Sequence, residues 1–349
     1  MSNWDFYTSF NVSAREFIGM LTKFERGKSK AKTNRKTQVF DNVLITPTTT
    51  HIDLVKVVQN LKVTGKIKKV FFDCGGYDVQ LKSITYKQMQ EKVFEKFLAH
   101  TWADIYCLPD NPLISGDTPE QVKDKVNTTV SGSIELYEKL PTQIQKNAMP
   151  VVIGHTKSDI DFCIDQYKKN MDNVKYMGFG AWATKQGSPS INLVNVQTLR
   201  LFAHASKRLE QSNIKLHAFG IASSPAIALL LALGAHSIDS AAWMIAGGYG
   251  LIYMPLKSVS AISTGHMRYN SSHKHMSKKE FQNLKKHTGH ECPFCETYEH
   301  LAHDRMNRLL HNLCVLCNIA PYDAILHEHI LRNTSKKFYG ITKKLGIAL

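Results

Sequence analysis

Two aspartates stand where a strand-like apolar run gives way to small residues and glycines. Asp73 follows Val70-Phe71-Phe72 and precedes Cys74-Gly75-Gly76, and Asp239 ends an apolar run that small residues follow as far as Gly247-Gly248. A carboxylate at a strand end, next to glycines, can be held rigidly while a substrate comes close. Each aspartate alone is also what a helix cap requires. Taken as a pair they suit chemistry at a glycosidic carbon, where one carboxylate attacks and the other moves protons.

The second chemically suggestive segment is rich in cysteine and histidine. Of the seven cysteines, four form two close pairs, Cys292/Cys295 and Cys314/Cys317, which in an intracellular chain favours metal binding over disulfides. His290 lies two residues before the first pair and His311 follows on a helical stretch. Either His290, Cys292, Cys295 and His311 or the four paired cysteines would give Zn²⁺ a closed tetrahedral structural site. By spacing the four cysteines fit well, but residues 308–317 also form a continuous helical pattern in which Cys314 and Cys317 would be core residues.

Seven short apolar runs alternate with helical patterns and would have to position these side chains. The runs cover residues 43–45, 70–72, 104–108, 150–154, 176–180, 216–220 and 237–239. This alternation indicates βαβ units and a parallel sheet. The number of units predicts an α/β protein with a (β/α)₈ TIM barrel and a C-terminal zinc-binding subdomain, and no G-x-G-x-x-G supports a dinucleotide fold.

Active sites of such barrels lie at the C-terminal ends of the strands. Polar residues, glycines and aromatic residues recur at those ends in this chain: Asp73, Asp110, Gly154, His155, Gly178, Phe179, Gly180, Phe219, Gly220 and Asp239. We predict a basic N-terminal segment over residues 1–40, the catalytic barrel over 41–255, and a zinc-binding segment with C-terminal helices that complete the barrel over 256–349.

The chain of 349 residues carries a formal net charge of +15, which indicates a polyanionic partner, most often nucleic acid. Five cations of the N-terminal segment are candidate phosphate contacts, although such a run is also typical of a solvated loop: Lys28, Lys30, Lys32, Arg35 and Lys36. No apolar run is long enough to span a bilayer, and the N-terminus lacks the pattern of a secretory signal. We therefore expect a cytoplasmic protein without a membrane partner.

These motifs resemble, in order from about residue 42 to 330, those of the tRNA-guanine transglycosylase superfamily. The segment Phe71–Tyr77 resembles the family's D-S-G-G-F, and Gly234–Ser240 its nucleophile segment G-V-D-x-F-D-C. Cys292-x-x-Cys295-x-x-Tyr298 followed by His311-Asn312 resembles its zinc element, with His290 in place of the first cysteine.

The resemblance implies roles for these residues. Asp239 would be the nucleophile and Asp73 the general acid/base, while Asp110 would read the Watson–Crick edge of the base. The base pocket would be lined by the strand-end residues Gly154, His155, Gly178, Phe179, Gly180, Phe219 and Gly220. The structural Zn²⁺ would be held by His290, Cys292, Cys295 and His311 rather than by the four paired cysteines.

Where the family's tRNA enzymes have P-T-R-x-A-R-x-G after the nucleophile, this chain has Ala241–Gly248. That departure resembles the DpdA-type branch, phage and bacterial enzymes that place a 7-deazaguanine in DNA. The implied function is exchange of a flipped-out guanine for 7-cyano-7-deazaguanine or a relative, giving DNA that resists restriction, in the host cytoplasm if the gene is carried by a phage. The alternatives are the same exchange on tRNA and a non-catalytic nucleic-acid-binding barrel.

Overall fold

A computed structural model describes residues 4–30, 39–76, 79, 84–182, 184–185, 188–192, 194–262 and 273–346. The chain divides into two compact units. Unit 1 comprises residues 1–9, 41–220 and 233–239, and unit 2 comprises residues 10–40, 221–232 and 240–349. Each unit contains one of the two groups of side chains on which the sequence analysis centred.

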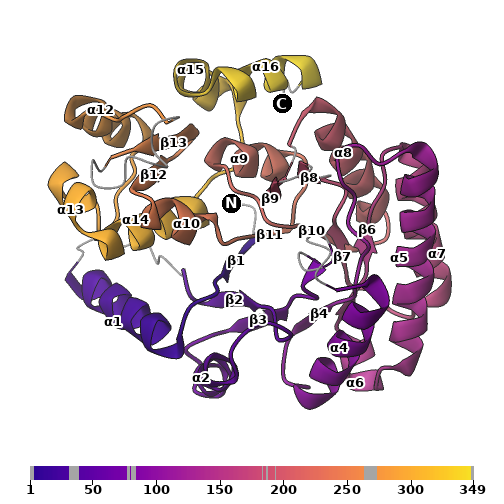
Figure 1. The fold of residues 1–349 in the computed structure, drawn as a ribbon. Coiled ribbons are helices and arrows are strands. Elements are labelled where there is room, and N and C mark those ends of the chain that lie inside the picture. Colours follow the sequence, from indigo (N-terminus) through magenta and orange to yellow (C-terminus); the bar gives the residue numbers. More distant parts are fainter. Residues whose placement is uncertain are drawn as a thin grey trace. The chain divides into compact units, whose positions relative to one another are not determined.

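Unit 1 is built on a parallel sheet that nearly closes on itself (Figure 1). Its nine strands follow the order β5-β4-β3-β2-β1-β11-β10-β7-β6. Their bounds are β1 Asp5–Ser9, β2 Asn42–Ile45, β3 Lys69–Phe72, β4 Ile105–Cys107, β5 Ala148–Met149, β6 Val151–Val152, β7 Tyr176–Phe179, β10 Lys215–Ala218 and β11 Ser237–Ser240. The edge strands β5 and β6 are separated only by Pro150, which has no backbone N–H to donate. The predicted α/β class is confirmed, and the sheet is consistent with a TIM-like barrel.

The helices of unit 1 lie outside the strands (Figure 1). They are α2 Ile52–Val63, α4 Tyr86–Ala99, α5 Pro119–Lys139, α6 Thr142–Gln145, α7 Lys157–Asn170 and α8 Val196–Glu210, and a small antiparallel pair, β8 Thr184–Lys185 and β9 Ser188–Asn192, precedes α8. The helices α4, α5, α7 and α8 each begin at a capping box, in which the cap side chain and the third helical residue satisfy each other's backbone N–H groups.

Strand alternation decides which side chains face the inside of the sheet. On β3, the ring of Phe71 packs edge-on against Tyr7 and His217, while Phe72 packs against Tyr106 and the α4 residue Phe97. Residues that share the parity of Phe71, including Asp73, therefore turn inward.

Strand β1 was not predicted by the sequence analysis, which treated residues 1–40 as a basic segment. Asp5–Phe6–Tyr7–Thr8–Ser9 pairs in parallel with β2 through Thr8 and Val43, and Asp5 N–H donates to the His236 carbonyl at 3.0 Å. The central residues Phe6, Tyr7 and Thr8 are buried although the strand is short and starts with a charge. This strand fills the place between β2 and β11 that the seven predicted runs left vacant.

Unit 2 is mainly helical. It contains α1 Ala14–Lys30, α9 Ser224–Ala232, α10 Ala242–Gly248, α12 Lys278–Thr288, α13 Tyr298–His303, α14 Arg305–Cys317, α15 Ala324–Thr334 and α16 Lys336–Leu345, together with an antiparallel pair, β12 Leu251–Met254 and β13 Lys257–Ala261. Helix α14 is buried from Arg308 to Leu316, and its polar residues Arg308, His311 and Asn312 are 4%, 0% and 0% exposed. Among the described residues, no helix has the length and apolar character that crossing a membrane requires.

Helices α10 and α14 cross at Gly247. A Cβ at that position would lie 3.0 Å from the Leu309 backbone nitrogen and 3.1 Å from its Cα, whereas a Cβ at Gly248 would meet nothing within 4 Å. Arg308 Nε also donates to the Gly247 carbonyl at 3.0 Å. The two helices can approach this closely only because residue 247 has no side chain.

The two adjacent glycines of α10 offer a matched test of this contact. Gly247→Ala should lower the free energy of unfolding by about 1–3 kcal/mol because the added methyl displaces backbone. Gly248→Ala should raise it by roughly 0.5–1 kcal/mol, since alanine loses less entropy in a helix. Urea titrations of the two variants would measure both effects, and changes of the same sign would contradict this account of the crossing.

Candidate active site and candidate metal centre

Asp239 is an inward-facing carboxylate near the C-terminal end of β11. The residue is 7% exposed, and its Oδ1 accepts the Gly220 backbone N–H at 2.7 Å. His217 Nε2 lies 3.2 Å from the same oxygen. Within the described part of the chain no hydrogen bond involves Oδ2, so one carboxylate oxygen is anchored and the other is available to a reacting atom.

His217 is a site residue that the sequence analysis did not predict. It is 1% exposed, and its Nδ1 lies 2.9 Å from the Ser237 hydroxyl oxygen. Nε2–H can donate to Asp239 while Nδ1 bonds the Ser237 hydroxyl, so the two contacts hold the imidazole in one orientation. The rings of Phe71 and Phe219 pack edge-on against the imidazole at 4.9 and 4.7 Å and fix its plane.

Asp73 follows β3 directly and accepts two hydrogen bonds on one oxygen. The Thr46 hydroxyl and the Gly75 backbone N–H donate to Oδ2 at 3.1 and 3.2 Å. Gly75 has φ +80°, and a Cβ there would lie 3.1 Å from the Thr46 methyl carbon, so this tight turn requires glycine. Burial, and next the negative charge of Asp239, raises the pKa of Asp73 to about 6. A carboxyl group with that pKa can both give and take a proton near neutral pH.

Asp110 lies beside Asp73, in the loop after β4. Cβ atoms at Gly76 and Gly180 would lie 3.2 and 3.1 Å from its carboxylate oxygens, so these glycines make room for it. Its Oδ1 is 3.9 Å from Cys74 Sγ. Burial, and then the charge of Asp73, raises the pKa of Asp110 to about 7. The structure thus brings three of the predicted carboxylates, Asp73, Asp110 and Asp239, to one end of the sheet.

Strand β7 carries two other predicted base-pocket residues, Gly178 and Phe179, which face opposite sides of the sheet. Gly178 faces inward and makes room for Phe219, because a Cβ at Gly178 would lie 2.2 Å from the Phe219 ring. Phe179 instead packs its ring against Trp182 and the α8 residue Phe202, in the layer between strand and helix.

Gly154 and His155 immediately precede Thr156, the N-cap of α7. The His155 backbone N–H donates to Asp159 Oδ2 at 3.0 Å, and a Cβ at Gly154 would lie 2.3 Å from the Asp159 Cβ. These contacts form part of the cap at the start of the helix. Among the described contacts, none connects the His155 side chain to Asp73 or Asp239.

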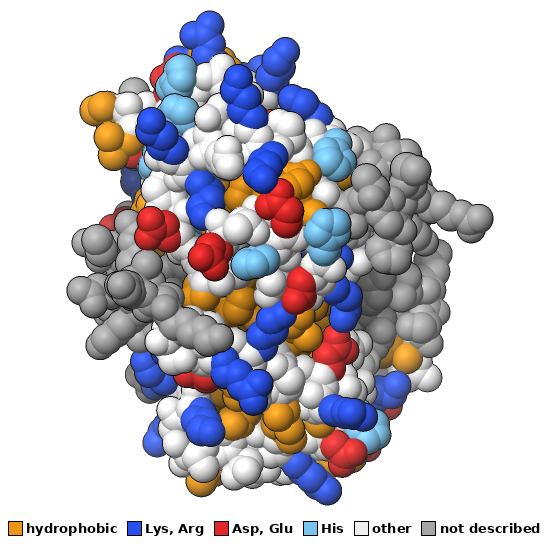
Figure 2. All heavy atoms as spheres, turned by 90° about the vertical axis from the view of Figure 1, so that its left-hand side faces the viewer, with side chains coloured by type: hydrophobic (Ala, Val, Ile, Leu, Met, Phe, Trp, Pro, Cys, Tyr) orange, Lys and Arg blue, Asp and Glu red, His pale blue; other side chains and the backbone are white. Residues whose placement is uncertain are grey.

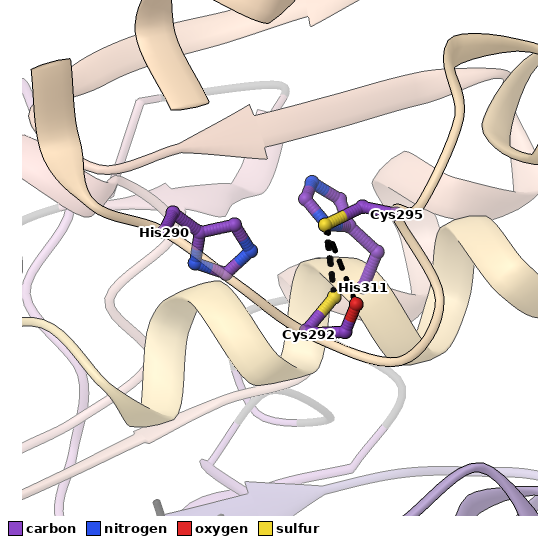
Figure 3. A group of neighbouring side chains, drawn as sticks. All are labelled: His290, Cys292, Cys295 and His311. Carbon is purple, nitrogen blue, oxygen red and sulfur yellow. Dashed lines mark hydrogen bonds between the residues drawn. The ribbon is translucent and has the colours of Figure 1, made fainter. Parts of the chain in front are cut away.

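Unit 2 contains a candidate metal centre (Figure 3). One ligand atom from each of His290, Cys292, Cys295 and His311 lies within 4.8 Å of every other. Cys292 Sγ is 3.3 Å from Cys295 Sγ and 3.4 Å from His311 Nδ1. His290 Nε2 is buried and has no hydrogen-bond partner among the described residues, which is costly for a polar atom unless something coordinates it. Two sulfurs and two imidazoles are the donor set that Zn²⁺ prefers, so the residues fit this ion.

The surroundings of these side chains also suit a metal ligand set. His311 Nε2 lies 3.0 Å from the Tyr253 carbonyl oxygen, so Nε2–H donates there and Nδ1 is left as the ligand atom. Burial lowers the pKa of His290, which keeps its imidazole neutral. The adjacent Asn312 bonds the Tyr253 N–H at 2.9 Å and the Leu251 carbonyl at 3.0 Å, and thereby fixes α14 to β12.

The group of four contains neither Cys314 nor Cys317. Cys314 is buried on α14 close enough to Cys292 to affect its pKa, and Cys317 ends the same helix. The arrangement agrees with the histidine-containing set that the family resemblance favoured, and not with the set of four cysteines.

The predicted phosphate contacts are mostly beyond what the structure describes. Lys28 is exposed near the end of α1, whereas the Lys30 side chain and Lys32, Arg35 and Lys36 lie outside the described residues. On the face drawn in Figure 2, coloured Lys and Arg side chains are spread widely, with Asp and Glu side chains between them.

Comparison with known proteins identifies no relative: the chain matches no protein-family model and no curated protein.

The metal centre predicts which single substitutions remove metal. Purified protein should contain about one zinc ion per chain, and Cys292→Ala, His290→Ala and His311→Ala should lose it and unfold unit 2 at lower denaturant. Cys317→Ala should keep the metal, because Cys317 lies outside the group of four. Elemental analysis after gel filtration measures the content. Zinc lost in Cys317→Ala but kept in His290→Ala would favour the four-cysteine set.

The raised carboxyl pKa values predict a pH-dependent stability. The pKa values of Asp73 and Asp110 are about 6 and 7, above the ~3.9 of an unfolded aspartate. Between these limits the folded state holds more protons than the unfolded state, so the free energy of unfolding should fall as pH rises from about 4 to about 7.

Asp110→Asn should remove part of that slope. We expect it to be more stable than the wild type by more than about 1 kcal/mol at pH 8, with the difference shrinking toward pH 4. Asp124→Asn, an exposed position on α5, is the matched control. Urea titrations across this pH range would measure the effect, and a pH-independent difference would contradict the assignment.

Proposed function

We propose that this protein is a transglycosylase that exchanges a guanine in DNA for a 7-deazaguanine through a covalent link between Asp239 and C1′. The observation that carries the proposal is the contrast between two carboxylates at one end of the sheet, the buried Asp239 and the partly buried Asp73. Asp239 has one oxygen anchored by two donors, while Asp73 has a pKa raised to about 6. Retaining displacement at a glycosidic carbon needs one group of each kind.

Asp239 would act as the nucleophile. Gly220 and His217 hold Oδ1, which leaves Oδ2 to attack C1′ as the C1′–N9 bond breaks and its electrons pass to N9 of guanine. His217 is a positioning residue in this mechanism, since it contacts the nucleophile and is itself oriented by Ser237. Covalent attachment divides one difficult displacement into two easier steps and retains the configuration at C1′.

Asp73 would carry the proton between the two bases. In its protonated form it gives a proton to the departing guanine, and as a carboxylate it takes the N9 proton of the incoming base, which then attacks C1′ and releases Asp239. A pKa of about 6 keeps both forms accessible near neutral pH. Asp110, beside it, would accept hydrogen bonds from the N–H groups on the base edge.

The target guanine would be flipped out, because C1′ and the base edge are inaccessible in a duplex. The barrel would be a (β/α)₈ type with a zinc-binding subdomain, in which His290, Cys292, Cys295 and His311 hold a structural Zn²⁺. That ion would supply folding free energy and take no part in the exchange.

The same exchange on tRNA is the second candidate, because the resemblance covers the catalytic motifs of the tRNA enzymes. The full chain should be incubated with labelled 7-cyano-7-deazaguanine and either plasmid DNA or bulk tRNA. We expect label in DNA. Label in tRNA alone would replace the DNA substrate, and label in neither polymer would count against base exchange for this base.

Replacing each of the two carboxylates should block the exchange at a different step. Asp239→Asn removes the attacking charge, so a denaturing gel should show no covalent enzyme–DNA adduct. Asp73→Asn keeps the nucleophile but loses the proton carrier, so we expect turnover to fall by about 10²–10⁴-fold while an adduct still forms slowly. Asp124→Asn, exposed on α5, should behave as the wild type.

The reverse pattern would exchange the roles. An adduct that persists in Asp239→Asn and disappears in Asp73→Asn would make Asp73 the nucleophile. Full activity in both variants would end the transglycosylase proposal.

A further inference from the structure

Two thiols and a carboxylate converge at the ends of β3 and β4. Asp73 and Cys74 follow β3 directly, and Cys107 is the last residue of β4. One ligand atom from each of the three residues lies within 4.8 Å of the other two. The proposed exchange uses Asp73 but gives the two cysteines no task.

Burial of the cysteines alone is compatible with ordinary core packing. Cys74 and Cys107 are 2% and 1% exposed, and burial, followed by the contact with Cys74, raises the pKa of the Cys107 thiol well above its usual range. Buried, protonated thiols react slowly with oxidants, which makes a regulatory disulfide a poor explanation of the pair.

The carboxylates distinguish this cluster from a core pair. A carboxylate oxygen of Asp73 lies within 4.8 Å of both sulfurs. Asp73 is itself only partly buried, so an ion could reach the thiols past it. Asp110 Oδ1 lies 3.9 Å from Cys74 Sγ, close to the roughly 3.5 Å that separates a sulfur and an oxygen on one tetrahedral zinc ion. Two sulfurs with carboxylate oxygens form a donor set for thiophilic divalent ions.

We propose that Asp73, Cys74 and Cys107 form a second metal site, which binds Zn²⁺ or Cd²⁺, while Asp110 lies beside Cys74 but outside this group of three. Binding forms two metal–sulfur bonds and releases the two thiol protons to water. The site is in unit 1 and shares no residue with the candidate centre of unit 2.

Metal at this site would inhibit the exchange. This consequence, unlike the site itself, rests on the proposed function, because it requires Asp73 to be the group that moves protons. A coordinated Asp73 cannot take up a proton from the incoming base, and the ion would occupy space beside Asp110 where the base edge would bind.

The site can be tested by counting metal in the full chain, without an activity assay. Protein isolated with its zinc is dialysed against micromolar Cd²⁺, and bound zinc plus cadmium is measured together with the ultraviolet absorption of cadmium–thiolate bonds. We expect about two ions per chain in the wild type and about one in Cys74→Ser, Cys107→Ser and Cys107→Ala. Cys163→Ser, which changes a fully buried thiol of the same unit outside the cluster, should keep both.

Two results would overturn the proposed second metal site. A wild type that binds only one ion, or a second ion retained in Cys74→Ser and in both Cys107 variants, would overturn the proposal. Far-ultraviolet circular dichroism checks that the variants are folded, and Cys107→Ala guards against a defect caused by a buried serine hydroxyl.

The exchange assay then tests inhibition separately. Cd²⁺ should slow incorporation of label by the wild type by about 100-fold or more, the effect of losing a general acid/base group, and slow Cys107→Ser much less relative to its own metal-free rate. Equal inhibition of both would overturn the inhibitory role. If no enzyme incorporates label, the proposed function fails while the metal count still stands as the test of the site.

Discussion

Unit 1 is constrained by the need to bury several carboxyl groups at one end of its sheet. Like charges in a poorly solvated site repel each other, so each group needs donors or a proton. Asp239 is satisfied by a backbone N–H and the imidazole of His217, both on the β10 side of β11. Asp73 receives two donors on one oxygen and has a raised pKa in addition. The same compensation also gives the two aspartates different chemistry, because two donors hold one oxygen of Asp239 in place, while the raised pKa of Asp73 lets it exchange a proton.

In unit 2, helix α14 also buries polar side chains along much of its length, and each of them needs a hydrogen-bond partner. Arg308 donates to the carbonyls of Gly247 and Leu301, and Asn312 bonds backbone groups of β12. These contacts orient the helix without the help of a metal ion. His311 adds a bond from Nε2 to a backbone carbonyl, which turns Nδ1 toward the two sulfurs. The polar face of α14 therefore acts as a support for the candidate metal ligands, as the outer contacts of metal-binding histidines commonly do.

The sequence predicted the parts of the fold that depend on local pattern. Apolar runs predicted strand β3, which Asp73 follows, and strand β11, which carries Asp239. Strand β1 was missed because five residues, beginning with a charge and flanked by polar segments, carry too little periodic signal. His217 was missed because a single histidine in an apolar run is usually a core residue. What could have revealed it is parity: on adjacent parallel strands, alternation turns residue 217 to the same side as Asp239. Phe179, which was predicted to line the base pocket, has the opposite parity, and its ring packs toward α8.

Burial thus sets the same electrostatic problem in both units, and two kinds of positive charge can solve it. A proton neutralises a carboxyl group such as Asp73, whereas a metal ion neutralises thiolates such as those that Cys292 and Cys295 would provide. At the ends of β3 and β4 both kinds of group occur together, because Cys74 and Cys107 place sulfur beside Asp73, a carboxyl group whose pKa is raised to about 6. Proton and metal compete there for the same oxygen. The occupant is decided by pH and metal concentration rather than by a change of fold, which would let a side chain with a proposed catalytic task also respond to the metal content of its surroundings.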